Sequence, residues 1–587
     1  MFEHEQQQME ARILAWCAEN GLPEPTLQWT WIPFSGQWGI STSFFQLAAQ
    51  EARSGKRVIV PQRAAELAEA VAAHLGTPAG FDRVEAVKGY LNLYFPPQDY
   101  TRRVVDAVLD AGASFGRGER LGQRIMVEFS HPNTHKAFHV GHLRGAILGD
   151  ALARLLDAAG YDVIRANYPG DMGLHVMKWL WNYAKHHHGE RPGADITRWM
   201  GDLYAEANRR LEENPELEAE VRALYVRWDQ RDPEVVALWE ETRQWSLDGF
   251  NAMYAQLGIP FDVYYFNSQM EQPGKVIVDE LIRRKIAQDE RPDGAVIVKL
   301  DELLGEKGEK YRVLVVLRSD GTALYATEDL ALATRKFADY PDMVKCIYVV
   351  DVRQSQHFTQ VFKTLEIAGR DWAKNLQHLP YGLVSLPGNV VMASREGTVV
   401  LLEDLIREAT RRALDIVKVK NPDLSAEAQQ SVAQAVAIGA IRYPMISREN
   451  AKDVTFDWES ALNFDGQAAP YIQYAQVRAN SILRKAGGSV PPALTPTHEL
   501  SRQEIALVDL IARFPREVQR AAAELSPMVI ANLTFELAQA FNDFYNQCPV
   551  LQVEEPVRAA RLRLTAATRQ AIINGLALLG ITAPQAM

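Results

Sequence analysis

The chain has 587 residues, with 47% hydrophobic and 23% charged side chains and a formal net charge of −11 at pH 7. This length predicts several domains, and the composition is that of a globular protein with a large core, which argues against a disordered chain. The acidic balance lacks the basic footprint usual for nucleic-acid binders, although single faces of a multidomain chain can still be basic. Two basic runs, 478–485 and 558–569, are candidates, but a solvated helix face accounts for either run alone more simply.

The first 120 residues alternate helical patterns with short strand-like runs such as Tyr90–Phe95, which predicts a small α+β domain. From Arg124 the pattern changes to strand, helix and strand: the apolar run IMVEF, a helix over 141–159 and a strand over 162–167. Strands that alternate with helices predict a parallel, doubly wound α/β sheet.

The sequence pattern changes twice more after residue 175. Residues 175–258 are charged, rich in tryptophan and helical in pattern, and predict a helical insertion into the α/β fold. We expect the α/β pattern to resume with strands near 295–300, 311–318 and 346–351. Strand patterns stop after about residue 400, so an all-helical region over 425–587 is expected, interrupted by a Gly/Pro-rich linker at 486–496.

The cysteines and the absence of long apolar runs indicate in which cellular compartment the protein is expected. Cys17, Cys346 and Cys548 lie far apart and no CxxC pair occurs, which disfavours a structural zinc site and suits a reducing environment. The polar, acidic start of the chain fits no secretory or transit signal, and no run approaches the ~18 uncharged apolar residues of a membrane span. We therefore expect a cytoplasmic protein without a membrane partner.

The most informative segment follows the first strand of the α/β sheet and ends in His139-Val-Gly-His142, where a helix begins. The first turn of a helix presents free backbone N–H groups and a partial positive charge, which makes it an anion site. His139 and His142 are three residues apart and can both donate hydrogen bonds to phosphate oxygens. Gly141 allows a base or ribose to approach the backbone closely. The segment therefore predicts a nucleotide phosphate site.

The same segment is open to two further interpretations. One is a metal site, because His131 and His135 lie close to His139 and His142; Pro132 and Gly141 disfavour the continuous helix that such a site needs, and HExxH is absent. The second is a set of ordinary polar turn residues. The chain has no GxxxxGK[ST] motif, which disfavours a P-loop enzyme.

With these residues in view, the chain resembles the class I aminoacyl-tRNA synthetases, because HVGH after a strand is similar to their HIGH motif. The resemblance is strongest to the arginyl branch and runs from about residue 85 to the last residue. It is carried by five segments in matching order: SHPNTHKAFHVGHLRGAILGD, SDGTALYATEDLALA, YVVDVRQSQHFTQVF, APYIQYAQVRANSIL and NGLALLGITAPQAM.

The resemblance implies a fold and a division of the chain. It implies an α/β, Rossmann-like class I catalytic domain at 121–420 with a helical insertion at about 175–258. An α+β domain at 1–120 would contact the tRNA D-loop, and an all-α domain at 421–587 would bind the anticodon. The family is usually monomeric, so a monomer is expected.

The resemblance also implies the reaction. The enzyme would activate L-arginine with ATP and Mg²⁺ to arginyl-adenylate and transfer it to tRNA(Arg), with tRNA needed for activation and no tightly bound cofactor. Catalysis would depend on positioning and on stabilising phosphate charge, and His139 and His142 are the candidates for the second role. Gly141 and Met392 are further ATP contacts by resemblance.

The same resemblance implies an arginine pocket. It would be lined by Glu128, Asn133, Tyr325, Asp329 and Gln354. A guanidinium offers a planar fork of donors that carboxylates accept, so two carboxylates, Glu128 and Asp329, suit arginine better than an uncharged amino acid. Tyr325 and Asp329 share one helix face by their spacing. Without the resemblance, Asp329 would be interpreted as a solvent-exposed helix carboxylate.

One segment departs from the family pattern. The family's second motif, KMSKS, corresponds here to Val391-Met-Ala-Ser-Arg395-Glu-Gly397, and both lysines are missing. Some arginyl enzymes have a lysine just before the HIGH motif, and Lys136 occupies that position. We therefore expect Lys136, helped by Arg395, to supply the missing positive charge; the alternative for Lys136 is an ordinary surface lysine.

The remaining candidates are RNA contacts implied by the resemblance. Tyr90 and Asn92 would stack on and read a loop base, although an alternating strand with both side chains outward accounts for them nearly as well. The anticodon candidates are Tyr471, Gln473, Tyr474, Arg478, Tyr545 and Met587. Most aromatic residues of this helical region should still be core.

Two alternative functions stay open from the sequence. The first is a synthetase for another amino acid, but the clustered zinc-ligand cysteines of a cysteinyl enzyme are missing, and an acidic or amide substrate would not favour two carboxylates. The second is a non-catalytic RNA-binding paralogue, and the missing loop lysines are the observation that favours it.

Overall fold

The computed structural model describes the chain except residues 1–2, 33–34, 56, 139, 307, 387–389 and 392–400, and the side chains of residues 3, 140, 386, 390 and 391. The described residues form two compact units. Unit 1 contains residues 1–115, 475–515 and 533–574, and unit 2 contains residues 116–474, 516–532 and 575–587. None of the described helices is long and apolar enough to cross a membrane.

Unit 1 begins with a four-stranded antiparallel sheet in the order β1-β2-β4-β3. Its elements are α1 (Glu3–Glu19), β1 (Thr30–Trp31), β2 (Gly39–Ser43), α2 (Phe45–Arg53), α3 (Val60–Leu75), β3 (Arg83–Val87), β4 (Tyr90–Tyr94) and α4 (Pro97–Ala111). Along β4, Leu91 and Leu93 are buried while Tyr90 is exposed, because successive side chains of a strand point to opposite faces. The predicted α+β character of this region is confirmed.

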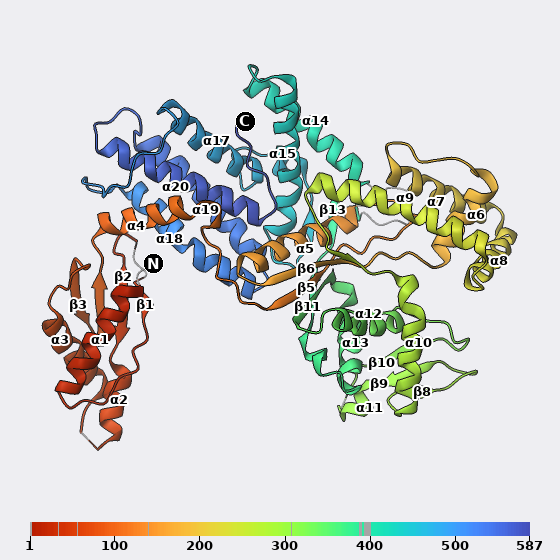
Figure 1. Ribbon diagram of the computed structural model, residues 1–587, viewed down its shortest axis with the longest axis horizontal. Helices are drawn as coiled ribbons and strands as arrows, with labels where there is room; N and C mark the ends of the chain where they lie inside the picture. The colour runs from red at the N-terminus through yellow and green to blue at the C-terminus, as the bar shows by residue number, and fades with distance from the viewer. Residues whose placement is uncertain are drawn as a thin grey trace. The chain divides into compact units, whose positions relative to one another are not determined.

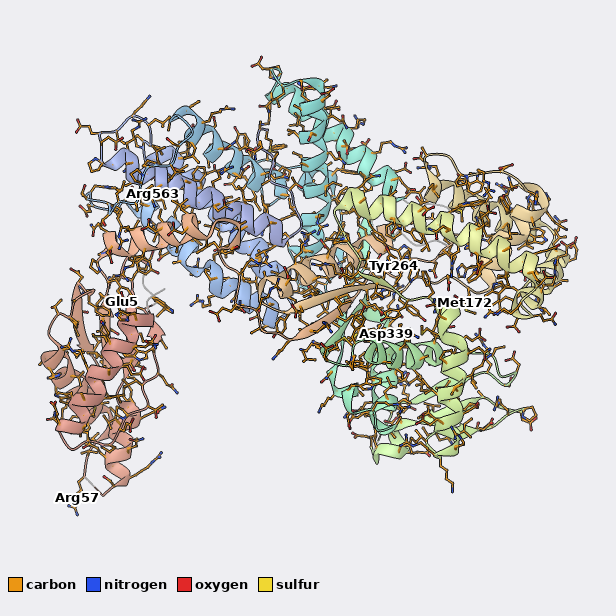
Figure 2. The ribbon with its side chains drawn as sticks, in the orientation of Figure 1. Glu5, Arg57, Met172, Tyr264, Asp339 and Arg563 are labelled. Atoms are coloured by element: carbon orange, nitrogen blue, oxygen red, sulfur yellow. The ribbon has the colours of Figure 1, made fainter. Side chains whose placement is uncertain are left out.

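The same unit contains parts of four long helices from the end of the chain. They are α17 (Ala469–Lys485), α18 (Arg502–Ala523), α19 (Pro527–Gln547) and α20 (Val557–Leu578). Within unit 1, Arg563 of α20 pairs with Asp106 of α4 at 2.5 Å, and its guanidinium is only 9% exposed (Figure 2). Asn574 also donates to the backbone oxygens of Gly112 and Phe115. Buried polar contacts therefore connect segments that are far apart in the sequence.

Unit 2 is built on a five-stranded parallel sheet in the order β12-β11-β5-β6-β7. The strands are β5 (Arg124–Glu128), β6 (Asp162–Asn167), β7 (Val263–Tyr264), β11 (Met343–Asp351) and β12 (Leu376–Tyr381). Figure 1 shows α5 (Val140–Ala158) on one face of the strands and α12 (Tyr325–Asp339) and α13 (Ser355–Ile367) on the other. The order reverses between β11 and β5, and ligands of such sheets bind at that point, beyond the carboxyl ends of the strands.

A helical insertion follows β6, as predicted. It consists of α6 (Leu174–His186), α7 (Ile196–Glu213), α8 (Glu218–Asp229) and α9 (Pro233–Leu257), with a short 3-10 helix at Pro215–Leu217. The tryptophans that mark this region in the sequence form its own core, in which Trp179, Trp181, Trp228 and Trp239 are all buried. A large buried aromatic cluster gives these helices a separate hydrophobic centre.

The strands predicted near 295–300 and 311–318 form, but they do not join the parallel sheet. β9 (Val296–Lys299) and β10 (Val313–Leu317) do form, but they pair antiparallel with each other and with β8 (Gln288–Asp289), outside the parallel sheet. Helices α10 (Asn267–Arg283) and α11 (Leu300–Leu304) flank them. Strand-forming side chains do not encode whether a strand pairs in parallel or antiparallel, so the sequence pattern could not separate the two sheets.

Beyond the parallel sheet, the described residues are mostly helical, with three short strands. The elements are β13 (Val384–Leu386), β14 (Val390–Val391), α14 (Leu402–Lys420), α15 (Ala426–Ile446), β15 (Val454–Thr455) and α16 (Trp458–Ala461). β15 corrects the expectation that strands end near residue 400, because it pairs in parallel with β13. A two-residue strand is too short to leave a periodic pattern in the sequence.

Candidate active site

A cavity of 740 Å³ lies in unit 2 at the carboxyl ends of β5, β11 and β12. It has the size of an ordinary small-molecule site. Of the residues singled out from the sequence, it is lined by Glu128, Asn133, Gly141, His142, Tyr325, Asp329 and Gln354. The structure therefore brings one proposed phosphate contact, His142, to the same cavity as all five expected arginine contacts.

The loop between β5 and α5 has a strained backbone. Ser130, His131 and His135 all have positive φ angles, of 85°, 51° and 59°. Non-glycine residues in this region are uncommon and cluster at functional sites. The loop is secured by Thr134, whose backbone N–H donates to Gly170 at 2.8 Å, and by a bridge between Asn133 and Gly170. A Cβ atom at residue 170 would lie 2.4 Å from the Asn133 amide oxygen, so glycine is required beside Asn133.

His135 fixes this loop to the helical insertion. Its ring is fully buried, with Nδ1 2.9 Å from the Thr134 hydroxyl and Nε2 2.8 Å from the hydroxyl of Thr242 in α9. The loss of hydration on burial lowers the pKa of His135 well below its usual value, so the ring is neutral. Both ring nitrogens are engaged by hydroxyls, which gives His135 a structural role in place of metal ligation.

One end of the cavity is formed by the first turn of α5, where the sequence predicts the phosphate contacts. His142 lines the cavity, and its ring stacks on Phe138 with centroids 5.4 Å apart and an interplanar angle of 8°. Gly145, one turn further along α5, allows close approach, since a Cβ there would lie 2.8 Å from the Tyr381 hydroxyl. His139, Met392 and Arg395 lie outside the described residues.

Lys136 does not line the cavity. Its ammonium group lies 5.0 Å from the centre of the Tyr204 ring in α7, a cation–π contact. Burial, with a smaller contribution from the Lys136 charge, lowers the pKa of His175 to about 3. In this conformation Lys136 therefore contacts the insertion.

Glu128, one of the two carboxylates expected in the arginine pocket, is already paired within the protein. Its side chain is 2% exposed and forms an ion pair with the fully buried ammonium of Lys336 in α12. His131 Nε2 lies 3.3 Å from its other oxygen. Burial alone would raise the pKa of Glu128, but the Lys336 ammonium and His131 outweigh burial and lower it. The charge of Glu128 is thus balanced inside the protein.

Asp329 is the second expected carboxylate, and its surroundings differ. One carboxylate oxygen lies 2.6 Å from Nε2 of His357, and the side chain is 16% exposed at the cavity wall. Tyr325 lies one turn earlier on α12 and is 77% exposed. Tyr325 and Asp329 therefore face the same cavity, as their spacing predicts.

Sequence reasoning missed two side chains that contact the pocket carboxylates, the ammonium of Lys336 and the imidazole of His357. Lys336 is seven residues after Asp329, and this helical spacing places it on a similar face of α12. His357 lies within YVVDVRQSQHFTQVF, one of the segments that carry the resemblance. Helical periodicity offered a signal for Lys336, but the pairing of His357 with Asp329 depends on tertiary contact.

Glu328, beside Asp329, is a buried acid next to the cavity. It is 8% exposed and accepts a hydrogen bond from Asn267, which also donates to Tyr168 at 2.7 Å. Burial, with the neighbouring charge of Asp329, raises the pKa of Glu328 to about 8. The folded protein therefore holds a proton here that an unfolded chain would release near pH 4.5.

Because Glu328 keeps its proton in the folded protein, we predict that Glu328→Gln changes the stability of the protein by an amount that depends on pH. Because the folded pKa is raised, Glu328 costs stability progressively from about pH 4.5 to about pH 8, and the neutral amide removes that cost. We expect the melting temperature of Glu328→Gln, relative to the original protein, to rise as pH increases across this window. Differential scanning fluorimetry from acidic to mildly alkaline pH measures this, and a difference that stays constant with pH would contradict a buried neutral acid.

The RNA-contact candidates fall into accessible and inaccessible groups. Tyr90 is 48% exposed and Tyr545 is 44% exposed. The Arg478 guanidinium lies 4.7 Å above the Tyr545 ring and also donates to Asn542 at 2.5 Å. Asn92, Tyr471 and Tyr474 are partly buried, and the Lys420 ammonium lies 5.4 Å from the Tyr474 ring.

Two candidates are buried in this structure. Gln473 is 0% exposed, and its amide donates to the backbone oxygens of Ala435 and Thr582. Met587 is 6% exposed. Direct contact with RNA therefore does not fit either residue in this conformation, and Gln473 instead links α15 and α17 to the end of the chain.

Comparison with known protein families shows which proteins this chain is similar to. Residues 104–458 match the family model described as tRNA synthetases class I (R), catalytic domain, and residues 472–587 match the DALR anticodon binding domain. Among curated relatives, an arginine–tRNA ligase of Clostridium perfringens is 38% identical over 89% of this chain and 90% of its own length. One of Alkaliphilus metalliredigens is 33% identical over the same shares.

Two solved structures are also similar to this chain along nearly its whole length. The arginyl-tRNA synthetase of Thermus thermophilus is similar with a TM-score of 0.75 and 27% identity, over 99% of this chain and 100% of that chain. The arginyl-tRNA synthetase of Plasmodium falciparum shares the fold with a TM-score of 0.72 at 20% identity, over 99% of both chains. The expected α/β fold class is confirmed over nearly the whole length.

Proposed function

Because the chain belongs to the arginyl class I tRNA synthetase family, we propose that it is an arginine–tRNA ligase. In the first step an oxygen of the arginine carboxylate attacks the α-phosphorus of ATP, and pyrophosphate leaves. In the second step a terminal ribose hydroxyl of tRNA(Arg) attacks the carbonyl carbon of the adenylate, its proton is lost and AMP leaves. Mg²⁺ would enter with the ATP phosphates, as is usual for this ion.

One observation carries this proposal: a single cavity holds both Asp329 and the first turn of α5 with His142. Asp329 supplies the negative charge that a guanidinium requires, and the exposed ring of Tyr325 offers a face on which it can stack. Glu128, already paired with Lys336, would orient the substrate without adding net charge. Asn133 and Gln354 would complete the amino-acid contacts as neutral hydrogen-bonding groups.

The phosphate end would act through position and hydrogen bonding. The N–H groups of the first turn of α5 and the ring of His142 would face the developing phosphate charge, and Gly141 would leave room for the nucleotide. His139, Met392 and Arg395 keep their proposed roles from the resemblance. We further propose that bound tRNA is needed for activation and that the enzyme acts as a cytoplasmic monomer.

The test is arginine attachment to tRNA(Arg) by the purified protein. We expect labelled arginine to become acid-precipitable only when ATP, Mg²⁺ and tRNA(Arg) are all present, and lysine not to replace arginine. Binding of tRNA(Arg) without any charging would instead favour the non-catalytic RNA-binding paralogue. Charging with a different amino acid would favour a synthetase of another specificity.

Lys136→Ala tests the substitute for the missing loop lysines. If the ammonium leaves Tyr204 to meet the ATP phosphates, its loss should lower kcat of arginine-dependent ATP–pyrophosphate exchange by about 10- to 100-fold, as for other charge stabilisers of a transition state. Lys178→Ala is the control, because Lys178 lies in the insertion and pairs with Glu218 at 3.1 Å. Normal exchange by Lys136→Ala would make Lys136 a structural contact of the insertion.

Tyr545→Ala tests the RNA surface of the helical region. Removal of a stacking aromatic should weaken tRNA(Arg) binding by about 1–3 kcal/mol, or roughly 5- to 150-fold, and leave ATP binding unchanged. Phe541→Leu is a matched control on the same helix, because Phe541 is fully buried. Filter binding measures both variants; an equal loss for both would indicate a disturbed fold in place of a lost RNA contact.

A further inference from the structure

A second cavity, of 540 Å³, lies in unit 2 away from the residues that line the proposed active site. Helices α7 and α9 of the insertion form one side of it, and α14 and α15 form the other. Its apolar lining includes Met253, Ile406 and Leu414, and its polar lining includes three glutamines and the charged side chains of Asp195, Glu403, Arg407 and Arg411. The lining therefore offers both apolar contacts and charged or polar groups to a small molecule.

Glu403 in the first turn of α14 is the unusual residue of this cavity. It lines the cavity, it is 7% exposed, and neither carboxylate oxygen has a hydrogen-bond partner among the residues that the structure describes. A buried carboxylate without a partner is costly in either protonation state, because the proton of the neutral acid would also need an acceptor. Burial raises the pKa of Glu403, which is the expected response of such a group.

The neighbouring cations are already paired with other carboxylates. Each of three arginines near Glu403 has its own partner, the pairs being Arg198–Asp404, Arg407–Asp195 at 3.2 Å and Arg411–Glu408 at 2.8 Å. Arg407 and Arg411 are 61% and 59% exposed, so their guanidinium groups are well hydrated where they lie. Among the described residues Glu403 is therefore the carboxylate of this cluster without an ion pair, although the charge of Arg198 is near enough to offset part of the effect of burial on its pKa.

We propose that this cavity is a binding site for a small organic cation, an alkylammonium or guanidinium group on a short aliphatic stem. The cation would pair with Glu403, and the stem would lie against Ile406, Leu414 and Met253. An organic cation suits the site better than an inorganic ion: of the two carboxylates in the lining, Asp195 is already paired with Arg407, and Glu403 alone offers too few oxygens for a metal. This site does not depend on the proposed ligase activity.

The position of the site between the insertion and α14 suggests that its ligand affects how these helices pack. Glu403 lies three residues after the end of the segment 392–400, and the cavity wall is shared by the insertion and by α14. A ligand bound to Glu403 would stabilise the insertion helices α7 and α9 against α14, because it contacts both sides.

The test uses n-butylamine as the probe, with 1-butanol as its neutral counterpart of nearly equal shape. Saturation-transfer NMR on the full chain should detect butylamine at millimolar concentration and should detect butanol much more weakly. Glu403→Gln keeps the side-chain shape but removes the charge, and it should weaken butylamine binding by about tenfold or more. Ala252→Leu, which fills space at the α9 wall, should weaken binding without touching the carboxylate.

Two controls locate the site. Glu408→Gln changes a partly exposed carboxylate on the same helix that is paired with Arg411 and Arg412 and does not line the cavity, and it should leave butylamine binding unchanged. Asp329→Asn, in the other cavity, should also leave it unchanged. No butylamine signal with the original protein, an undiminished signal with Glu403→Gln, or an equal loss with Glu408→Gln would each overturn the proposal.

Discussion

Replacing Asp329 with asparagine should lower kcat/KM for arginine by about 100- to 1000-fold in ATP–pyrophosphate exchange. Loss of one member of a buried, hydrogen-bonded charge pair costs about 2–5 kcal/mol, and the guanidinium would then meet only a neutral amide. Because Glu128 is already balanced by Lys336, it cannot replace the lost charge. The KM for ATP should change little, since the proposed phosphate site is at the α5 end of the cavity.

Asp339→Asn is the matched control for this variant. Asp339 is on the same helix, pairs with Arg335 at 2.9 Å and lies at the end of α12, where Figure 2 labels it. It does not line the cavity, so its substitution should leave arginine kinetics within about threefold of normal. A comparable loss in both variants would indicate a general disturbance of α12, and no loss in Asp329→Asn would remove Asp329 from the arginine site.

Replacing His142 with alanine should lower kcat of the exchange reaction by about 100- to 1000-fold and change the KM for arginine little. The physical reason is that a donor aimed at charge that develops on the phosphates acts mainly in the transition state. The stack on Phe138 holds the ring in place before the substrate arrives, so no ordering is needed at the moment of reaction.

Two further variants make this result specific. His142→Asn retains one amide donor and should recover part of the loss. His74→Ala, on α3 of the N-terminal region, should have normal exchange kinetics. An exchange rate for His142→Ala within about threefold of normal would mean that this side chain does not stabilise the phosphates.

The sequence predicted which elements contribute residues to the site, but not which charged side chains pair with one another. HVGH after a strand placed His142 and Gly141 correctly at the start of α5, because a strand followed by a helix is a local pattern. The same holds for Tyr325 and Asp329, whose shared face follows from helical periodicity alone. The pairing of Glu128 with Lys336 depends on contact between a strand and a distant helix, which no local pattern records.

Accessibility was the second property that the sequence could not supply. Gln473 and Tyr474 are neighbours in one segment, yet Gln473 is fully buried with its amide bonded to backbone oxygens, while Tyr474 is partly exposed. The antiparallel pairing of β9 with β10 was unpredictable for a similar reason, because the choice of partner strand is made by tertiary packing.

The central claim is that this cavity activates arginine, and ATP–pyrophosphate exchange with purified protein tests it most directly. We predict exchange that requires both arginine and tRNA(Arg), and that falls to background when either is left out. Absence of arginine-dependent exchange, with tRNA(Arg) binding intact, would contradict the claim and identify the chain as a non-catalytic RNA-binding member of its family.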